Sequence, residues 1–268
     1  MGFLAEITAA NRSAVERPDY LDRLPLAGDR PRPSMRQAIS RRATSGSLIV
    51  EYKRASPGRP DPDLPARTLS DFVRLTDRPN VVAYSCLATR PRFHGGPLDV
   101  YDLARVGRRP VLFKDFVVGE RQLDAAERAG ASAVLLIARL AVAGLLERPL
   151  AELAASAHRR GLEVLLEFHR EAELSEADGV AADMYGVNVR DLDTLTIDPA
   201  TAEATLGAAA AAGRRPLIGL SGVERPEDAA RFWDRGADGI LVGTAVARSS
   251  DPGKFLDSLA RDPRGSRA

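Results

Sequence analysis

The stretch Leu48-Ile49-Val50-Glu51-Tyr52-Lys53 decides the fold, because it joins a buried strand to charged side chains within a few residues. Its apolar, β-branched start is typical of a strand buried in a sheet. Glu51 and Lys53 are two positions apart, so an extended chain points both side chains to the same side. A sheet interior accepts such charges only when they are paired or functional. The stretch therefore predicts a strand whose carboxyl end carries either a salt bridge or part of a site.

Lysine usage favours a site over a simple salt bridge. The chain has 38 Lys and Arg residues, and its only lysines are Lys53, Lys114 and Lys254. An ammonium has a pKa that burial can lower, which is a property that a guanidinium lacks. Lys53 and Lys114 each end an apolar run, whereas Lys254 follows Asp-Pro-Gly near the C-terminus. We therefore expect Lys53 and Lys114 to be functional and Lys254 to lie at the surface.

The pattern of the first strand recurs along the chain. Apolar runs occupy Leu48–Lys53, Val81–Leu87, Pro110–Lys114, Ala133–Ile137, Glu163–Glu167, Met184–Asn188, Pro216–Leu220 and Gly239–Gly243. The intervening stretches have helical spacing, for example at Glu120–Ala129, Pro149–Arg160 and Pro226–Arg235. Eight strands alternating with helices predict an α/β fold, a (β/α)8 TIM barrel, which typically takes about 250 residues. An open doubly wound sheet is the alternative, but no glycine-rich loop follows the first strand.

Residues 1–47 are expected to form an N-terminal helical extension packed on a barrel made by residues 48–268. A helix is predicted from Phe3 to about Val15, and a second, short helix around Ser34–Arg41 with Ser34 as its cap. Between them lies a connector rich in Pro and Arg. The segment has too few apolar residues to fold alone, so we expect it to depend on the barrel.

Composition excludes several classes of function. The net charge of +1 argues against a nucleic-acid partner. No apolar run reaches the length of a membrane span and no signal peptide is visible, so we expect a cytoplasmic protein without a membrane partner. The single Cys86 permits no disulfide framework. His94, His158 and His169 are scattered, so we expect no metal, and a structural or supporting role for His169.

Polar residues gather where the apolar runs end. The ends carry Glu51, Lys53 and Ser56, then Lys114 and Asp115, Glu167 and His169, Asn188 and Arg190, Ser221 and Gly222, and Gly243 and Thr244. In a TIM barrel the carboxyl ends of the strands form the active-site face, and the loops after strands seven and eight commonly bind phosphate. Lysines and carboxylates together suit acid–base chemistry. The sequence therefore predicts an enzyme that acts on a small phosphorylated substrate.

Six motifs then resemble a known family. They are Glu51-Tyr52-Lys53-Arg54-Ala55-Ser56-Pro57, Phe113-Lys114-Asp115-Phe116, Glu167 after an apolar strand, Gly186-Val187-Asn188-Val189-Arg190-Asp191-Leu192, Ser221-Gly222-Val223 and Leu241-Val242-Gly243-Thr244. Their order and spacing resemble indole-3-glycerol phosphate synthase over about residues 3–260. The resemblance implies a TIM barrel of the tryptophan pathway without a cofactor. It implies conversion of 1-(2-carboxyphenylamino)-1-deoxyribulose 5-phosphate to indole-3-glycerol phosphate, carbon dioxide and water. We expect a monomer or weak homodimer.

The resemblance also implies roles for the motif residues. Lys114 resembles the general acid of ring closure, Lys53 the partner of the substrate carboxylate, Glu167 the base and Glu51 its helper in dehydration. The substrate-orienting positions correspond to Asn188, Arg190 and Ser221. The phosphate site corresponds to Arg54, Ser56, Gly222, Gly243 and Thr244. The apolar slot for the aromatic ring corresponds to Phe93, Phe116, Leu135 and Leu192.

One departure keeps alternatives open. The family has a glutamate before Ser221-Gly222, whereas this chain has Leu220, which cannot accept a proton. A paralogue acting on a ring-substituted substrate is one alternative, and a barrel that only binds is another, although the retained Lys53 and Lys114 argue against the second. The neighbouring isomerase of the pathway would need a Cys/Asp pair, and Cys86 lies within a strand with no carboxylate near it in the sequence.

Overall fold

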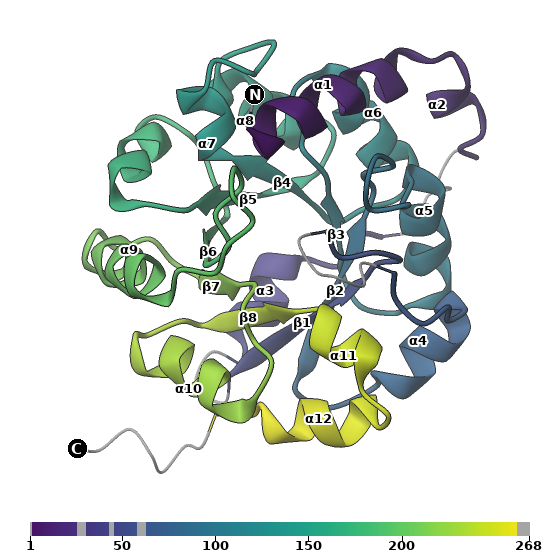
Figure 1. The fold of residues 1–268 in the computed structure, drawn as a ribbon. Coiled ribbons are helices and arrows are strands. Elements are labelled where there is room, and N and C mark those ends of the chain that lie inside the picture. Colours follow the sequence, from purple (N-terminus) through teal and green to yellow (C-terminus); the bar gives the residue numbers. More distant parts are fainter. Residues whose placement is uncertain (1, 26–30, 43–45, 58–62, 262–268) are drawn as a thin grey trace.

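A closed barrel of eight parallel strands forms the centre of the molecule in the computed structural model, which describes residues 2–25, 31–42, 46–57 and 63–261 (Figure 1). The strands follow one another around the barrel in chain order. They are β1 (Ser47–Tyr52), β2 (Val81–Leu87), β3 (Val111–Lys114), β4 (Ala133–Ile137), β5 (Glu163–Phe168), β6 (Met184–Asn188), β7 (Leu217–Leu220) and β8 (Gly239–Val242). The β1–β8 pairing closes the ring, for example Ile49 with Leu241. The predicted TIM barrel is confirmed.

Two strands begin one residue later than the sequence predicts, each just after a proline. Pro110 and Pro216 have no N–H to donate to a neighbouring strand. Their carbonyl oxygens still accept hydrogen bonds, from Tyr84 N and Tyr185 N respectively. Each proline therefore lies next to the sheet and leaves the first residue of the strand to the following position.

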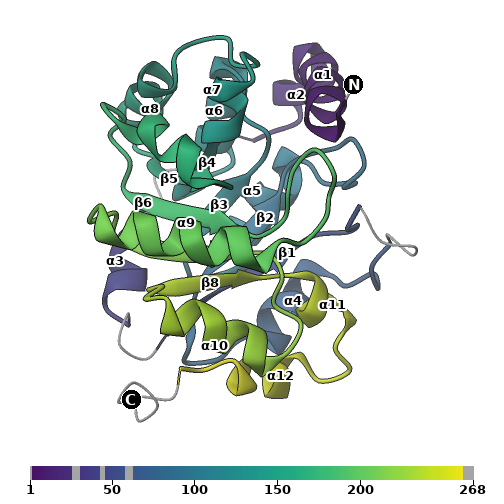
Figure 2. The same ribbon diagram turned by 60° about the vertical axis from the view of Figure 1, so that its left-hand side comes forward.

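Helices surround the barrel, as Figure 2 shows from a second direction. They are α4 (Leu69–Leu75), α5 (Pro97–Val106), α6 (Glu120–Arg128), α7 (Ala138–Val142), α8 (Leu150–Arg159), α9 (Pro199–Ala211), α10 (Pro226–Asp234), α11 (Thr244–Arg248) and α12 (Pro252–Ser258). The connection between β5 and β6 holds only the 3₁₀ helix η2 (Glu171–Ala177). This segment therefore departs from the expected alternation.

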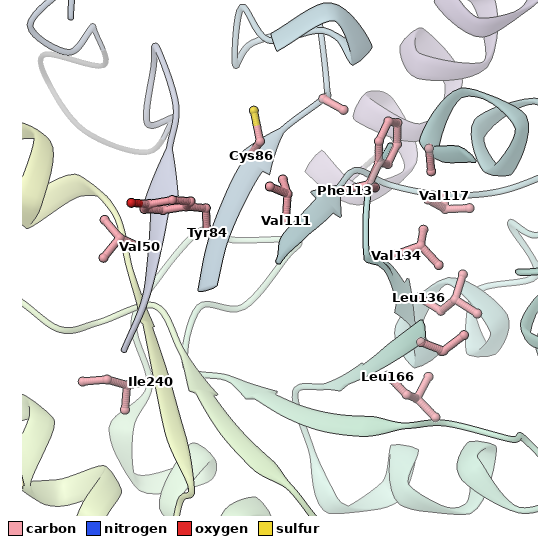
Figure 3. Close-up of a cluster of buried hydrophobic side chains, with 14 of the residues drawn as sticks. Val50, Tyr84, Cys86, Val111, Phe113, Val117, Val134, Leu136, Leu166 and Ile240 are labelled. Atoms are coloured by element: carbon pink, nitrogen blue, oxygen red, sulfur yellow. The ribbon is translucent and has the colours of Figure 1, made fainter. Parts of the chain in front are cut away.

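Alternating side chains divide the core into two layers. Val50, Tyr84 and Phe113 point outward into the layer between strands and helices, which Figure 3 shows. Ile49 and Leu112, one position away, point into the barrel interior. Successive residues of a strand face opposite sides, so a strand buried on both faces is apolar throughout. This explains why the strands appear in the sequence as continuous apolar runs.

The N-terminal segment contacts both ends of the barrel. Helix α1 (Phe3–Glu16) lies at the carboxyl end, where Asn11 Nδ2 donates to Asp115 Oδ1 at 2.9 Å. Helix α2 (Asp19–Asp22) follows it. Helix α3 (Met35–Ser40) buries Met35 and Ile39 in the interior cluster, and the Ile39 carbonyl accepts from Ser47 Oγ at 3.0 Å. The division into an extension of residues 1–47 and a barrel of residues 48–268 stays a proposal, and parts of both lie outside the described residues.

Within the described ranges, no helix combines the length and the apolarity that crossing a bilayer requires.

Candidate active site

A cavity opens at the carboxyl ends of the strands, and each of the eight strands or the loop after it contributes to its lining. Its empty volume is about 970 Å³ with the open mouth included. The carboxyl ends of the strands are the face at which TIM barrels are expected to place their sites. From the predicted set it brings together Glu51, Lys53, Ser56, Phe93, Lys114, Phe116, Leu135, Glu167, Asn188, Arg190, Leu192, Ser221, Gly222, Gly243 and Thr244.

Glu51 lies between the two lysines. Its Oε1 is 2.8 Å from Lys53 Nζ and its Oε2 is 3.8 Å from Lys114 Nζ. The Glu51 side chain is 4% exposed, and those of Lys53 and Lys114 are 13% and 20% exposed. The strand and its alternation deliver this arrangement, because Glu51 and Lys53 face the same side of the chain.

Burial and charge set the protonation of this cluster. Burial alone would raise the pKa of Glu51, but the charges of Lys53 and Lys114 lower it below its usual value. Burial lowers the pKa of Lys53, and Lys114 and Arg190 lower it further, while Glu51 opposes them. An ammonium with a lowered pKa releases its proton more readily near neutrality. Lys53 is therefore suited to donate a proton.

Gly243 gives the ion pair its space. A Cβ at this position would lie 2.8 Å from Glu51 Oε1 and 3.1 Å from Lys53 Cε. Both distances are shorter than ordinary contacts, and the atoms that the Cβ would meet belong to side chains, so Glu51 and Lys53 would have to shift. A side chain here would therefore displace the charged pair.

Glu167 lines the cavity and is held by one of its two carboxylate oxygens. Its Oε1 accepts from Asn188 Nδ2 at 3.1 Å and lies 3.3 Å from His169 Nε2. Its Oε2 has no hydrogen-bond partner among the described residues, although the side chain is only 1% exposed. A buried acceptor without a partner is costly unless a ligand satisfies it. The geometry suits a general base.

Arg190 lies on the loop that follows β6. Its backbone N–H donates to Asn188 Oδ1 at 3.1 Å, and its Nη1 donates to the carbonyl of Leu195 at 2.8 Å. Asn188 therefore contacts both Glu167 at the end of β5 and the loop that carries Arg190. These bonds position the guanidinium at the cavity, where it adds positive charge beside Lys53.

An apolar wall faces the charged groups. Phe93 and Phe116 have ring centroids 6.2 Å apart, and Leu135 and Leu192 line the same cavity. Phe3 of α1 joins them. Sequence reasoning missed Phe3, because it lies in a helix far along the chain from the strand ends. The N-terminal helix therefore contributes directly to the lining.

The loops after β1, β7 and β8 meet at the other side of the cavity. Ser56 Oγ and Thr244 Oγ1 form a hydrogen bond of 3.0 Å. Ser221 and Gly222 both have positive φ, at 67° and 74°, so the chain turns sharply after β7. Helix α11 follows Gly243 at once, whereas α10 begins only at Pro226. A helix therefore follows both turns, at once after β8 and a few residues later after β7.

Arg54 does not line this cavity. Its guanidinium pairs with Asp99, with Nη2 and Oδ1 2.5 Å apart, and lies 5.7 Å from the centroid of the Tyr52 ring. The alternation of an extended chain explains this, because Arg54 follows the inward Lys53 and points the other way. The geometry gives no support to the expected place of Arg54 in the phosphate group, and we leave it out of that site.

Asp115 lines the cavity but has a structural environment. Its carboxylate accepts from Thr89 Oγ1 at 2.6 Å, from Gln122 Nε2 at 2.9 Å and from Asn11 Nδ2 at 2.9 Å. Burial raises the pKa of Asp115, and these bonds oppose that rise. With its oxygens occupied, Asp115 anchors α1 and the β2 loop to the end of β3.

Leu220 and Cys86 bear on the alternatives. Leu220 is 1% exposed, pairs in register with Asn188 and Leu241, and lines the cavity. Cys86 belongs to the layer between strands and helices and does not line the cavity. Burial first, and then the charge of Asp99, raise the pKa of its thiol. A carboxylate is thus closer to Cys86 than the sequence indicated, but the pair lies outside the cavity.

Metal ligation finds no support in the part of the chain that the structure describes. No group of three or more His, Cys, Asp and Glu side chains there is placed to hold a metal ion.

Solved structures of low identity share the fold. A thiamine phosphate pyrophosphorylase from Pyrococcus furiosus has a TM-score of 0.57 at 18% identity, with 81% of this chain and 95% of that chain covered. An N-acetylmannosamine-6-phosphate 2-epimerase from Clostridium perfringens has a TM-score of 0.58 at 15% identity, with 86% and 97% covered. At these identities the likeness shows the barrel alone.

Relatives found by sequence have higher identities to this chain than these solved structures do. The chain is 30% identical to indole-3-glycerol phosphate synthase of Sulfurisphaera tokodaii over 264 residues, which covers 96% of this chain and 98% of the relative. It is 38% identical to that of Aeropyrum pernix over 228 residues, covering 81% and 80%. It is 33% identical to that of Exiguobacterium sibiricum over 216 residues, covering 81% of each. The family model described as indole-3-glycerol phosphate synthase matches residues 5–259, and the chain therefore belongs to the indole-3-glycerol phosphate synthase family.

Proposed function

We propose that the cavity carries out the reaction of the family, a carbon–carbon lyase reaction, with Lys114, Lys53 and Glu167 as its acid–base groups. The substrate would be the phosphorylated small molecule 1-(2-carboxyphenylamino)-1-deoxyribulose 5-phosphate. The observation that carries the proposal is the meeting of the half-buried Lys53 and Lys114 with the buried Glu51 and Glu167 in one cavity that aromatic side chains also line. Family membership supports the reaction, and the geometry supports the roles of these residues.

Ring closure is the first step. The ring carbon that bears the carboxylate attacks the C2 carbonyl of the ribulose chain, and the carbonyl oxygen takes a proton to become a hydroxyl. Lys114 is the proposed donor, because its ammonium lies beside Glu51 and its side chain lines the same cavity as the apolar residues. Positioned proton transfer of this kind contributes about 10²–10⁴-fold to rate.

Loss of carbon dioxide and water completes the indole. Breaking the bond between ring and carboxylate returns its electron pair to the ring system. The hydroxyl then leaves as water with a proton from an acid, and a base removes the hydrogen of the adjacent carbon. Lys53 is the proposed acid of this half and Glu167 the base, while Glu51 keeps Lys53 in place through the 2.8 Å ion pair.

Substrate placement follows from the two sides of the cavity. The aromatic ring would lie against Phe93, Phe116, Leu135 and Leu192. The phosphate would lie near Ser56, Gly222, Gly243 and Thr244, where small residues expose backbone N–H groups to an anion. Arg190 and Ser221 would orient the chain between them.

The experiment is turnover of the carboxyphenylamino substrate by the purified protein, followed by indole fluorescence. We expect activity in the wild type and a loss of about 10³-fold or more in kcat for Lys114→Ala. Lys254→Ala is the matched control, because the Lys254 side chain is 86% exposed and forms an ion pair with Asp251 in its own helix turn. Activity equal to wild type in Lys114→Ala, or none in the wild type, would contradict the proposal.

A paralogue with a ring-substituted substrate is the second candidate, which Leu220 favours by adding apolar surface to the cavity. Parallel assays with ring-substituted substrates test it: a higher kcat/KM for one of them than for the parent compound supports this reading. We also propose a cytoplasmic location. The proposed oligomeric state is a monomer or weak dimer, which gel filtration with light scattering would test.

A further inference from the structure

Beside Glu167 lie two buried ionisable groups that the proposed steps do not use. They are His169, which is 6% exposed, and Glu173, which is 3% exposed. Buried ionisable groups are costly, so those near a reacting carboxylate are candidates for a role in its chemistry.

The chain builds this arrangement in seven residues. Glu167 and His169 are two apart at the end of β5, so both point toward the barrel axis. Phe168, between them, points outward and stacks on Tyr185 with ring centroids 6.4 Å apart. The 3₁₀ helix η2 then turns the chain back, and Glu173 Oε2 accepts the backbone N–H of His169 at 2.7 Å.

The imidazole of His169 lies between two carboxylates. Its Nε2 is 3.3 Å from Glu167 Oε1, and its Nδ1 is 3.6 Å from Glu173 Oε2. Neither ring nitrogen has a hydrogen-bond partner among the described residues, but both distances are within reach of an ion pair. Burial alone would raise the pKa of Glu173, but its contacts with His169 and the charge of Arg139 lower it. Glu173 is therefore held as a carboxylate against the ring.

We infer that His169 is a positioning residue for Glu167, with Glu173 fixing the orientation of the imidazole. Nε2 lies 3.3 Å from Oε1, the same oxygen that Asn188 Nδ2 holds; this is an ion-pair contact without a hydrogen bond, so Asn188 and the imidazole both approach the carboxylate on one side. This leaves Oε2 directed at the substrate. The inference rests on the proposed function, in which Glu167 removes the proton of the last step. A base that is free to rotate would lose rate, since misplacement by about 1 Å can cost 10²-fold.

The first experiment compares two replacements of His169. His169→Leu keeps the volume and removes the donor, and we expect kcat to fall about 10–100-fold with KM changed less than about twofold. His169→Gln keeps an N–H near the position of Nε2, and we expect it to recover most of the lost kcat. His158→Gln is the matched control, because His158 pairs with Asp183 at 2.9 Å and does not line the cavity. It should leave kcat unchanged.

The second experiment does not depend on turnover. In crystal structures, Glu167 should occupy a different or mixed side-chain conformation in His169→Leu and its wild-type conformation in His169→Gln. An unchanged Glu167 together with an unchanged kcat in His169→Leu would overturn the inference, as would equal losses in both variants with a lowered melting temperature. Failure of the proposed function gives a different result, namely a wild type without turnover.

Discussion

Gly243 is the residue at which a single added carbon has the largest expected effect on the charged cluster. The Glu51–Lys53 ion pair lies directly against its backbone, so the end of β8 and the end of β1 must keep this spacing together. The two strands pair with each other through residues only one position earlier, with Val50 opposite Val242. The sequence shows Gly243 and Glu51 but not that they lie against each other.

Gly243→Ala should therefore separate Glu51 from Lys53 while leaving the fold intact. We expect kcat/KM to fall about 100-fold, because the new methyl would lie 2.8 Å from Glu51 Oε1 before relaxation. Gly207→Ala is the control, since a Cβ there has no atom within 4 Å and Ala favours the α9 helix. Steady-state kinetics and circular dichroism check both variants. A wild-type kcat/KM for Gly243→Ala would show that the pair tolerates displacement.

Leu220, like Gly243, is an uncharged residue whose replacement should change the reaction rate. It aligns with Asn188 and Leu241, and its Cδ1 lies 2.4 Å from where a Cβ of Gly186 would be, so it fills the space above that glycine. We expect Leu220→Glu to raise kcat/KM on the unsubstituted substrate about tenfold by adding a proton acceptor. It should also lower the free energy of unfolding by about 1–3 kcal/mol, because a charge replaces a buried side chain.

Leu220→Gln separates length from charge in this test. The glutamine side chain has the same length as glutamate but cannot act as a base, so Leu220→Gln should not raise kcat/KM. Indole fluorescence assays and urea unfolding measure the two effects. A fall in kcat/KM for Leu220→Glu would instead indicate that the leucine serves the reaction as it stands, which favours a ring-substituted substrate.

Among the elements, the loop between β6 and α9 depends on one carboxylate. Asp191 Oδ1 accepts from the backbone N–H groups of Asp193 and Thr194, each at 2.9 Å, and Oδ2 pairs with Arg170 at 2.9 Å. Burial alone would raise its pKa, but these bonds hold the pKa of Asp191 at about 2. The same loop carries Arg190 and Leu192 to the cavity.

Asp191→Asn should reveal this as a pH-dependent loss of stability. A carboxyl whose pKa is lower in the folded than in the unfolded state stabilises the fold above its unfolded value of 3.8, and the gain disappears as pH falls toward 2. Allowing for solvent screening, we expect a loss on the order of 1 kcal/mol at pH 7. Urea unfolding from pH 7 to pH 3 measures it. A difference from wild type that stays constant below pH 4 would contradict this account.

The elements found from the sequence are those with a strong pattern. Strands buried on both faces are continuous apolar runs, so all eight could be predicted, with their ends shifted by about a residue. Helix α2 and the 3₁₀ helix η2 are too short to show a period, and both were missed. The orientation of Arg54 could have been predicted from its neighbour Lys53. Phe3 could not, because its place depends on how α1 docks.

At the scale of the molecule, the two ends of the barrel have different roles. The carboxyl end holds the cavity, whereas the amino end is closed by α3. Strand β5 connects them, with Glu163 at its start and Glu167 near its end. Glu163 accepts hydrogen bonds from Ser34 Oγ and from the backbone N–H groups of Met35 and Arg36. One carboxylate thus caps a helix, and the other faces the cavity.

Glu163→Ala should destabilise the protein without slowing it. Removing a charged acceptor from three donors at a helix start should cost about 2 kcal/mol in the free energy of unfolding. The cavity is at the other end of the barrel, so kcat/KM should stay within about twofold of wild type. Glu167→Gln is the counterpart, with kcat reduced about 10³-fold and stability nearly unchanged. Equal effects of the two variants on kcat would contradict the division of roles between the ends.

The cavity draws on both extremes of the chain, with Phe3 on one side and Thr244 on the other. During synthesis the first helix leaves the ribosome long before β3 supplies Asp115 for it to bind, and the last wall arrives only after β8. A nascent chain in which Thr244 has not yet been added therefore lacks a complete pocket, whatever part of it has already folded. The ability to bind substrate should therefore appear late and abruptly during the synthesis of each molecule.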